Sequence, residues 1–317
     1  MTHSGAAGVR LAFAIGALLL ASSSTSAIPA APSTVSARST VQVQCDATMV
    51  ELPVTWYFPV SGRPAGLVWL QHGFFRANEN LADLASRLGR SGFLTFAITI
   101  PSFHERCNVN NVTTFVPNFA FLFGTLNEKG SPLLTSARAA GATVGMTVPR
   151  LPDRFVFSGH SAGGAVVTLA AREYVGRFPA FADRLAGLVL LDPVENFAGS
   201  IGSSLPSLAD VPILAISSPG SACNANTSGT TVLLRLARPF IGFELTSGSH
   251  CDAEGASGNP LLCGIVCGPM RPVNVFVLQR FAIGWSADLL LDRTTADLYP
   301  GGTLYDSLVE AGRIRTY

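Results

Sequence analysis

Short, unbroken apolar runs recur along this chain of 317 residues, and segments with helical spacing lie between them. Residues 66–71, 93–100 and 185–191 are such runs. Continuous hydrophobicity is typical of strands that are buried on both faces, as in parallel sheets covered by helices. The alternation therefore predicts an α/β fold with a mostly parallel central sheet and helices on both faces.

The other expected elements follow from the same periodicities. Further strands are predicted over residues 41–47, 50–59, 154–158, 212–217 and 240–246. Helices are predicted over residues 78–90, 131–142, 162–175 and 272–291. Residues 101–150 form a long stretch between two strands, with one of these helices and a Phe-rich patch, and we expect it to be an insertion.

The N-terminus has the three regions of a secretory signal peptide, which we place at residues 1–27. Residues 11–21 are apolar, and small residues follow up to Ala27. The run is shorter than the roughly twenty residues that span a bilayer, although an uncleaved anchor is the alternative. Residues 28–40 are rich in Pro, Ala and Ser and predict a flexible leader before a domain over 41–317. We expect a secreted protein, extracellular or in the periplasm or cell envelope, without a stable membrane span.

The charge and hydrophobic content of the chain limit the classes of partner that it can bind. Lys and Arg number 21 against 20 Asp and Glu, a net charge of +1, which argues against a nucleic-acid partner. Charged residues are only 13% of the chain, about half of the roughly 25% usual in soluble domains. A chain that is 48% hydrophobic can bury a large core and leave some apolar surface exposed.

An even number of cysteines in an exported chain predicts disulfides. The six are Cys45, Cys107, Cys223, Cys251, Cys263 and Cys267. They contain no C-x-x-C pair and lack His partners at finger spacing, so we expect no metal site. If the strands 212–217 and 240–246 are neighbours, the loops after them emerge side by side, which favours a Cys223–Cys251 bridge. Cys263 would then pair with Cys267, and Cys45 with Cys107.

One motif carries the chemistry. Gly159-His160-Ser161-Ala162-Gly163 is a G-x-S-x-G sequence between an expected strand and an expected helix, as a nucleophile elbow requires. A Gly-rich turn with a surface serine is the alternative. A serine needs a base, and His250 is the only histidine after Ser161. We expect His250 to be that base, unless it is a surface histidine of its loop.

The acid that orients the base is expected between the serine and the histidine. Asp192 directly follows the strand 185–191, at the carboxyl ends of the strands, where sites of open parallel sheets lie. Asp210 instead precedes the strand 212–217, so it lies at the edge of the sheet opposite to Ser161. Asp192 is therefore the predicted acid, with Glu195 in reserve.

Two backbone N–H groups are expected to hold the developing oxyanion. Ala162, which follows the nucleophile, should supply one. The loop after residues 66–71 reads His72-Gly73-Phe74-Phe75 and should supply the other, from Phe74 in preference to Phe75.

The combined motifs resemble the α/β-hydrolase superfamily, in particular its chlorophyllase-like and cutinase-like polyester-hydrolase branch. The similar pieces, which fall between residues 66 and about 252, are Gln71-His72-Gly73-Phe74, Gly159-His160-Ser161-Ala162-Gly163-Gly164, Leu191-Asp192-Pro193-Val194 and Gly248-Ser249-His250. Ala162 departs from the larger residue common in both groups. The resemblance also points to the Cys223–Cys251 pairing.

The resemblance implies an α/β-hydrolase fold with a partial cap and a secreted serine esterase or lipase. Its triad would be Ser161, Asp192 and His250, and it would need no cofactor. The substrate would be a small-molecule, lipid or polymer ester. The low charge and the Phe-rich patch indicate an apolar pocket that includes Phe75, Phe115 and Phe119, unless these rings are core of the insertion. A serine peptidase on the same fold and a non-catalytic secreted binding protein are the alternatives.

Overall fold

A single mixed sheet organises the part of the chain that the computed structural model describes, which is residues 1, 34–59, 62–105, 107–109, 112–196 and 198–317. The strand order is β1-β2-β4-β3-β5-β6-β7-β8-β9. The strands are β1 (Thr34–Cys45), β2 (Thr48–Pro59), β3 (Leu67–Gln71), β4 (Leu94–Ile98), β5 (Phe155–His160), β6 (Leu185–Leu191), β7 (Ile213–Ser217), β8 (Gly242–Leu245) and β9 (Ile314–Thr316). Neighbours from β4 to β8 are parallel, whereas the pairs β1–β2, β2–β4 and β8–β9 are antiparallel.

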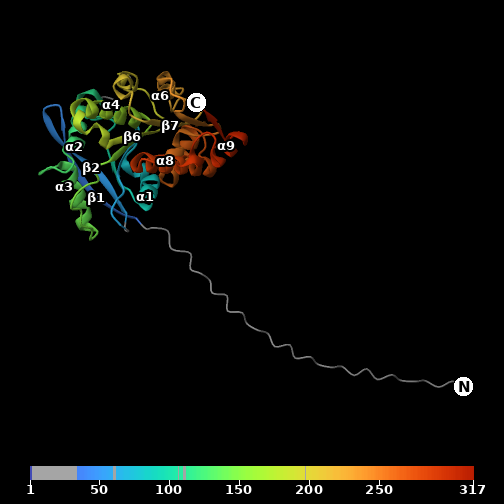
Figure 1. Cartoon of the computed structure of the whole chain (residues 1–317), viewed down its shortest axis with the longest axis horizontal. Helices are drawn as coiled ribbons and strands as arrows, with labels where there is room; N and C mark the ends of the chain where they lie inside the picture. Colours follow the sequence, from blue (N-terminus) through green and yellow to red (C-terminus); the bar gives the residue numbers. More distant parts are fainter. Residues whose placement is uncertain (2–33, 60–61, 106, 110–111, 197) are drawn as a thin grey trace. The chain divides into compact units, whose positions relative to one another are not determined.

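Helices cover both faces of this sheet, as the alternating pattern predicts (Figure 1). The α-helices are α1 (Ala82–Arg90), α2 (Val116–Gly124), α3 (Pro132–Thr143), α4 (Ala162–Arg177), α5 (Ser200–Ser204), α6 (Ser228–Leu233), α7 (Pro260–Val266), α8 (Pro272–Leu291) and α9 (Thr303–Glu310). Short 3₁₀ helices are η1 (Asn78–Leu81), η2 (Val112–Thr114), η3 (Pro179–Arg184), η4 (Leu205–Leu208), η5 (Leu234–Leu236), η6 (His250–Ser257) and η7 (Ala296–Leu298).

Each central strand is buried on both faces, so its side chains enter two separate cores. On β3, Leu67 and Trp69 belong to the core beneath α2 and α4, whereas Val68 and Leu70 belong to the core beneath α1 and α8. Successive side chains of a strand point to opposite faces, which explains why both alternating sets are apolar. The carboxyl ends of the parallel strands then meet along one edge, where the loops that carry the candidate site begin.

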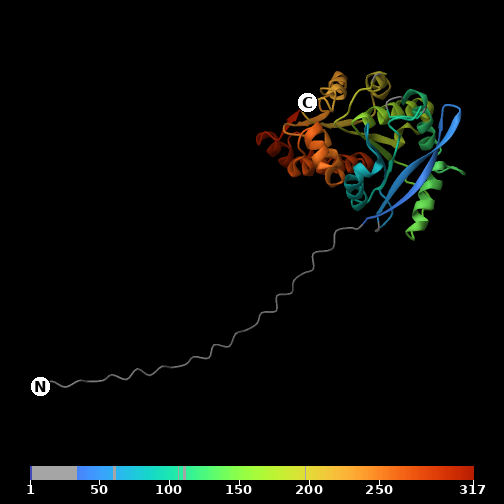
Figure 2. The same ribbon diagram turned by 180° about the vertical axis from the view of Figure 1, so that it is seen from behind.

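The first strand is longer than the sequence predicts. Thr34 pairs with Pro59 and the ladder continues to Cys45 and Thr48, so residues 34–40 belong to β1 and not to a flexible leader. The composition does not reveal this strand. Ala37 and Val41 are buried on one face, but most of the residues around them are polar. Figure 2 shows the long β1–β2 hairpin, drawn blue, at one edge of the sheet with α3 beside it. The expected signal peptide and residues 28–33 lie outside the described residues.

The stretch 101–150 contains a helix that the sequence analysis does not predict. This helix, α2, packs directly on the sheet, where the ring of Phe119 stacks on Trp69 with centroids 5.2 Å apart. Phe115 contacts Phe119 at 5.6 Å, and both side chains are fully buried. The expectation that Phe115 and Phe119 line a substrate pocket is therefore wrong. These rings fill the core between the helix and the sheet.

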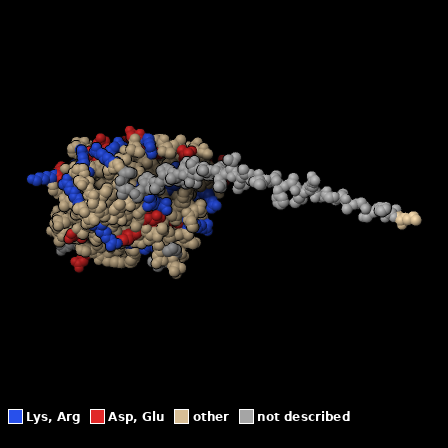
Figure 3. All heavy atoms as spheres, turned by 90° about the horizontal axis from the view of Figure 1, so that it is seen from below, with Lys and Arg blue, Asp and Glu red and all other residues tan. Residues whose placement is uncertain are grey.

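The surface agrees with the low charge of the chain. Basic and acidic side chains are interspersed on the face drawn in Figure 3, and other residues make up most of what is visible there. Within the described residues, no helix combines the length and apolar character needed to cross a bilayer.

A comparison of two phenylalanines on α2 tests the position of this helix. We expect Phe119→Ala to lower the free energy of unfolding by about 3–5 kcal/mol, because it empties a fully packed site. Phe121 is 45% exposed on the same helix, so Phe121→Ala should cost much less. Chemical denaturation measures both losses. Equal losses would contradict the packing of α2 on the sheet.

Candidate active site

Ser161 occupies a sharp turn between β5 and α4. Its backbone has φ 57° and ψ −129°, a sparsely populated conformation for a residue with a side chain. The surrounding backbone holds this turn. The N–H of Ser161 donates to the carbonyl of Leu191 at 3.1 Å, and its own carbonyl accepts from the N–H groups of Gly164 and Val194 at 2.9 and 3.0 Å. The turn is therefore tied both to its own helix and to the end of β6.

Two glycines allow the backbone to approach this turn closely. A Cβ at Gly73 would lie 2.5 Å from the Cβ of Ser161, and a Cβ at Gly163 would lie 2.5 Å from the carbonyl oxygens of Gln71 and His72. Both distances are too short for real atoms. The loop after β3 and the start of α4 can therefore pack together only with glycine at these positions.

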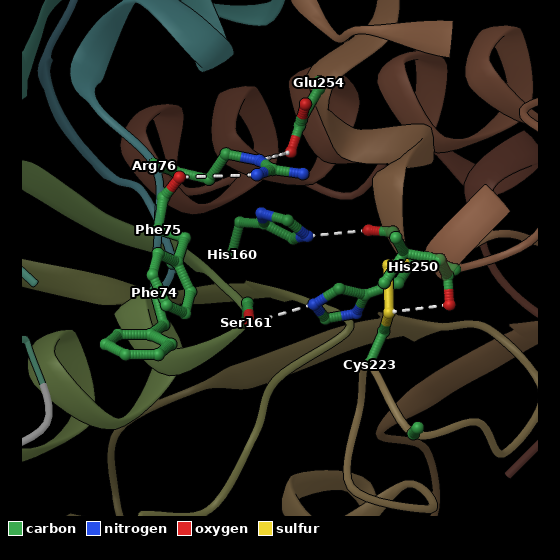
Figure 4. A pocket seen from close by; sticks show the side chains of 12 residues that line it. Phe74, Phe75, Arg76, His160, Ser161, Cys223, His250 and Glu254 are labelled. Atoms are coloured by element: carbon green, nitrogen blue, oxygen red, sulfur yellow. Dashed lines mark hydrogen bonds and ion pairs between the residues drawn. A yellow bond between two sulfur atoms is a disulfide. The ribbon is translucent and has the colours of Figure 1, made fainter. Parts of the chain in front are cut away.

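A chain of hydrogen bonds joins three of the predicted residues. His250 Nε2 lies 2.8 Å from Ser161 Oγ, and His250 Nδ1 lies 2.5 Å from Asp192 Oδ2. Ser161 comes from the turn after β5, Asp192 directly follows β6, and His250 begins η6 after β8. All three side chains are buried. Figure 4 shows Ser161 facing the imidazole of His250.

The carboxylate of Asp192 is held by residues that the sequence analysis does not single out. The N–H of Ser218 donates to Oδ1 at 2.9 Å and its hydroxyl donates to Oδ2 at 2.6 Å. The side-chain amide of Asn224 lies 3.3 Å from both oxygens. Burial by itself would raise the pKa of Asp192, but hydrogen bonds from His250 and Ser218 outweigh it and keep this pKa below its usual value. Asp192 is therefore an anion that faces the imidazole.

Two further histidines support the site and stay neutral. His160 Nε2 donates to the backbone carbonyl of His250 at 2.7 Å, so His160 joins the end of β5 to the start of η6. Burial, and then the neighbouring His250, lower the pKa of His160 to about 3. His72 bridges two loops, since Nδ1 donates to the carbonyl of Gly73 at 2.7 Å and Nε2 accepts from the N–H of Ile100 at 3.0 Å. Burial lowers the pKa of His72 to about 4.

Backbone amides for an oxyanion are available next to Ser161. Ala162 is the first residue of α4, and the first N–H groups of a helix have no acceptor within the helix. The N–H of Phe74 has no acceptor among the residues that the structure describes. The N–H of Phe75 donates to Ser102 Oγ at 2.8 Å, which removes Phe75 as a donor. Phe74 and Ala162, the two predicted donors, therefore have no acceptor in the part of the chain that the structure describes.

A cavity of about 550 Å³ opens above Ser161. Its lining residues are Gly73, Phe74, Phe75, Arg76, His160, Ser161, Ala222, Cys223, His250, Glu254, Val266 and Cys267. Figure 4 shows Phe74 and Phe75 on one side of Ser161, with His250 and Cys223 on the other. Phe75 is 63% exposed, so it is the one predicted pocket phenylalanine that lines the opening.

The other acidic candidates have different surroundings. The carboxylate of Glu195 accepts the N–H groups of Asn196, Ile201 and Gly202 and so caps α5. Asp210 is exposed just before β7, at the opposite ends of the strands. Neither contacts His250 in the described structure.

Three disulfides join the six cysteines, but two of the predicted pairings are wrong. Cys45–Cys107 agrees with the prediction. The other two are Cys223–Cys267 and Cys251–Cys263. The strands β7 and β8 are neighbours, which is the condition on which the predicted Cys223–Cys251 bridge rested. Their loops nevertheless do not bridge to each other, because α7 lies within reach of both, with Cys263 inside the helix and Cys267 directly after it.

Among the described residues, one cluster of possible metal ligands lies beside the site and consists of Cys251, Glu254 and Cys263. The two sulfur atoms form a disulfide with each other. They are therefore unavailable as thiolates, the form in which cysteine binds a metal.

A scan of the chain against protein-family models finds no match, and a search of curated proteins finds none either.

The disulfide pairing can be tested directly. We expect non-reducing peptide mapping to recover Cys223 linked to Cys267 and Cys251 linked to Cys263. A reduced and alkylated sample, which should release all four peptides singly, is the control. A peptide that links Cys223 to Cys251 would contradict this arrangement of the loops around the cavity.

Proposed function

We propose that the chain is a serine hydrolase of carboxylic esters with an α/β-hydrolase fold. The hydrogen-bonded series Asp192–His250–Ser161, with its serine on a strained turn between a strand and a helix, is the observation that carries the proposal. The order of the three residues along the chain is the order known for this fold. The free amides of Phe74 and Ala162 come from the two places that supply its oxyanion hole.

In the proposed reaction, Ser161 Oγ attacks the ester carbonyl carbon and His250 Nε2 takes the hydroxyl proton. The carbonyl oxygen becomes an oxyanion that the N–H groups of Phe74 and Ala162 stabilise. The C–O bond to the alcohol then breaks, and His250 gives the proton to the departing oxygen. A water molecule, deprotonated by His250, attacks the acyl-enzyme, and the acid leaves as Ser161 recovers its proton.

The cavity favours an ester with an apolar portion. Phe74, Phe75 and Val266 present hydrocarbon to the space above Ser161. Phe75 and Val266 are largely exposed at the opening, and Phe103 lies against both Phe74 and Phe75. A small apolar ester, a lipid or a polymer ester would each bury part of this surface. The three disulfides, together with the signal-like N-terminus, support a secreted protein from an oxidising compartment.

The nucleophile is tested with a panel of p-nitrophenyl esters of short and long acyl chains, measured beside peptide substrates. We expect ester turnover, covalent labelling of Ser161 by an organophosphonate, and loss of both in Ser161→Ala. Turnover of peptides alone would favour a peptidase. No turnover at all, with no labelling of the native chain, would favour a binding protein.

The acid is tested by comparing two aspartates. Asp192→Asn should lower kcat by about 10⁴-fold, because the imidazole loses the anion that orients it. Asp210→Asn is the matched control and should leave kcat unchanged, since Asp210 is exposed at the opposite ends of the strands. Circular dichroism and thermal unfolding check that both variants stay folded. The reverse outcome for the two variants would show that the acid is assigned to the wrong residue.

A further inference from the structure

A buried ion pair lies in the wall of the cavity, outside the three residues of the proposed reaction. Arg76 Nε is 2.5 Å from Glu254 Oε1. The side chain of Glu254 is 1% exposed and that of Arg76 is 18% exposed. Both residues line the same cavity as Ser161. This pair is much more buried than the ion pair Arg150–Asp153, whose side chains are 51% and 45% exposed.

The pair connects the two loops that the proposed reaction depends on. Arg76 lies two residues after Phe74, and its Nη1 also donates to the carbonyl of Phe75 at 3.3 Å. Glu254 lies in η6, the element that begins with His250. One guanidinium thus bonds to the loop that offers the oxyanion amide and to the element that carries the base. Figure 4 shows Arg76 between Phe75 and Glu254, with the ring of His160 next to it.

Other hydrogen bonds of η6 connect it to other parts of the fold. His160, at the end of β5, holds the carbonyl of His250. Asp83, on α1, accepts the N–H of Ala256 at 3.1 Å. These contacts fix η6 to the sheet and to α1. Among the side-chain hydrogen bonds of the described residues, those of Arg76 join η6 to the loop after β3, which carries Phe74.

Stability alone gives a poor account of this pair. Desolvation of two charges often costs as much as their attraction returns, and apolar replacements of buried pairs are often neutral or stabilising. The second carboxylate oxygen of Glu254 has no hydrogen-bond partner among the described residues, so the desolvation of this group is only partly compensated. Nη2 of Arg76 faces the sulfur atoms of Cys251 and Cys263 at 3.9 and 3.8 Å, which are weak acceptors.

We propose that Arg76 and Glu254 are positioning residues. They hold the Phe74 amide and the His250 imidazole at the right distance from each other, on either side of Ser161. The proposal rests on the ester hydrolase proposed above. An oxyanion donor and a general base must reach the same reacting group at once, and small displacements of either are costly in rate. The pair acts through the loops it joins and does not touch the reacting atoms.

The test separates positioning from folding by removing both charges together. Arg76→Met alone leaves Glu254 buried without a partner, so it should lower both Tm and kcat. The double variant Arg76→Met/Glu254→Leu removes the uncompensated charge and should bring Tm back to within a few degrees of the native value. Its kcat for a short-chain p-nitrophenyl ester should stay about tenfold to a hundredfold low, with KM changed less than about threefold.

A conservative variant and a distant ion pair complete the design. Arg76→Lys keeps a positive charge beside Glu254 but loses the guanidinium fork that reaches the Phe75 carbonyl, so Tm should hold while kcat falls. The rate of organophosphonate labelling of Ser161 should fall in parallel. Arg150→Met breaks the exposed pair and should change neither Tm nor kcat.

The outcomes are distinct for the two proposals. A native chain that turns over no ester contradicts the proposed function itself. If the native chain is active, a double variant with native kcat overturns the positioning role. So does a failure of both the double and the Lys variants to fold, because the pair would then serve folding and not alignment.

Discussion

The close packing of backbone against backbone around Ser161 is the constraint on which the site depends. The strained turn at Ser161 is held by carbonyls and amides from β6 and α4, and the loop after β3 approaches it where a Cβ at Gly73 would meet the serine side chain. Close backbone contacts therefore bring the loop after β3 against the turn at Ser161. The ion pair Arg76–Glu254 then joins this loop to the element that carries His250.

Next to that turn lie an ionised carboxylate, Asp192, and two neutral histidines. Asp192 is kept ionised by four hydrogen-bond donors, from His250, Ser218 and Asn224, even though it is buried. His72 and His160 are kept neutral by burial, and each uses a ring N–H to fix a backbone carbonyl. Neither of these histidines therefore adds a positive charge beside Asp192 near neutral pH.

Local patterns predict the central strands and the residues at their carboxyl ends, because a buried parallel strand and a strand-turn-helix both leave signatures within a few positions. Ser161, Asp192 and His250 can therefore be chosen from the sequence alone.

The helix α2 is missed because a short segment that is apolar on most sides lacks helical periodicity. Ser218, Asn224 and the pair Arg76–Glu254 depend on contacts between segments distant in sequence. Ser218 directly follows β7, so among these residues it is the one that the pattern of strands places beside Asp192.

The disulfides differ from the prediction because α7 lies between the two loops that carry Cys223 and Cys251. Neighbouring strands put the loops with Cys223 and Cys251 on the same edge, yet each cysteine bonds to a cysteine of the segment that contains α7. Cys251 adjoins His250, and Cys223 adjoins Asn224, which contacts Asp192. The two loops are thus tied through α7 and not to each other. Closing two chain loops at one short helix restricts the unfolded chain. In the folded chain the two disulfides join the segment of α7, with its exposed apolar side chains Leu261, Ile265 and Val266, to the loops on both sides of the cavity.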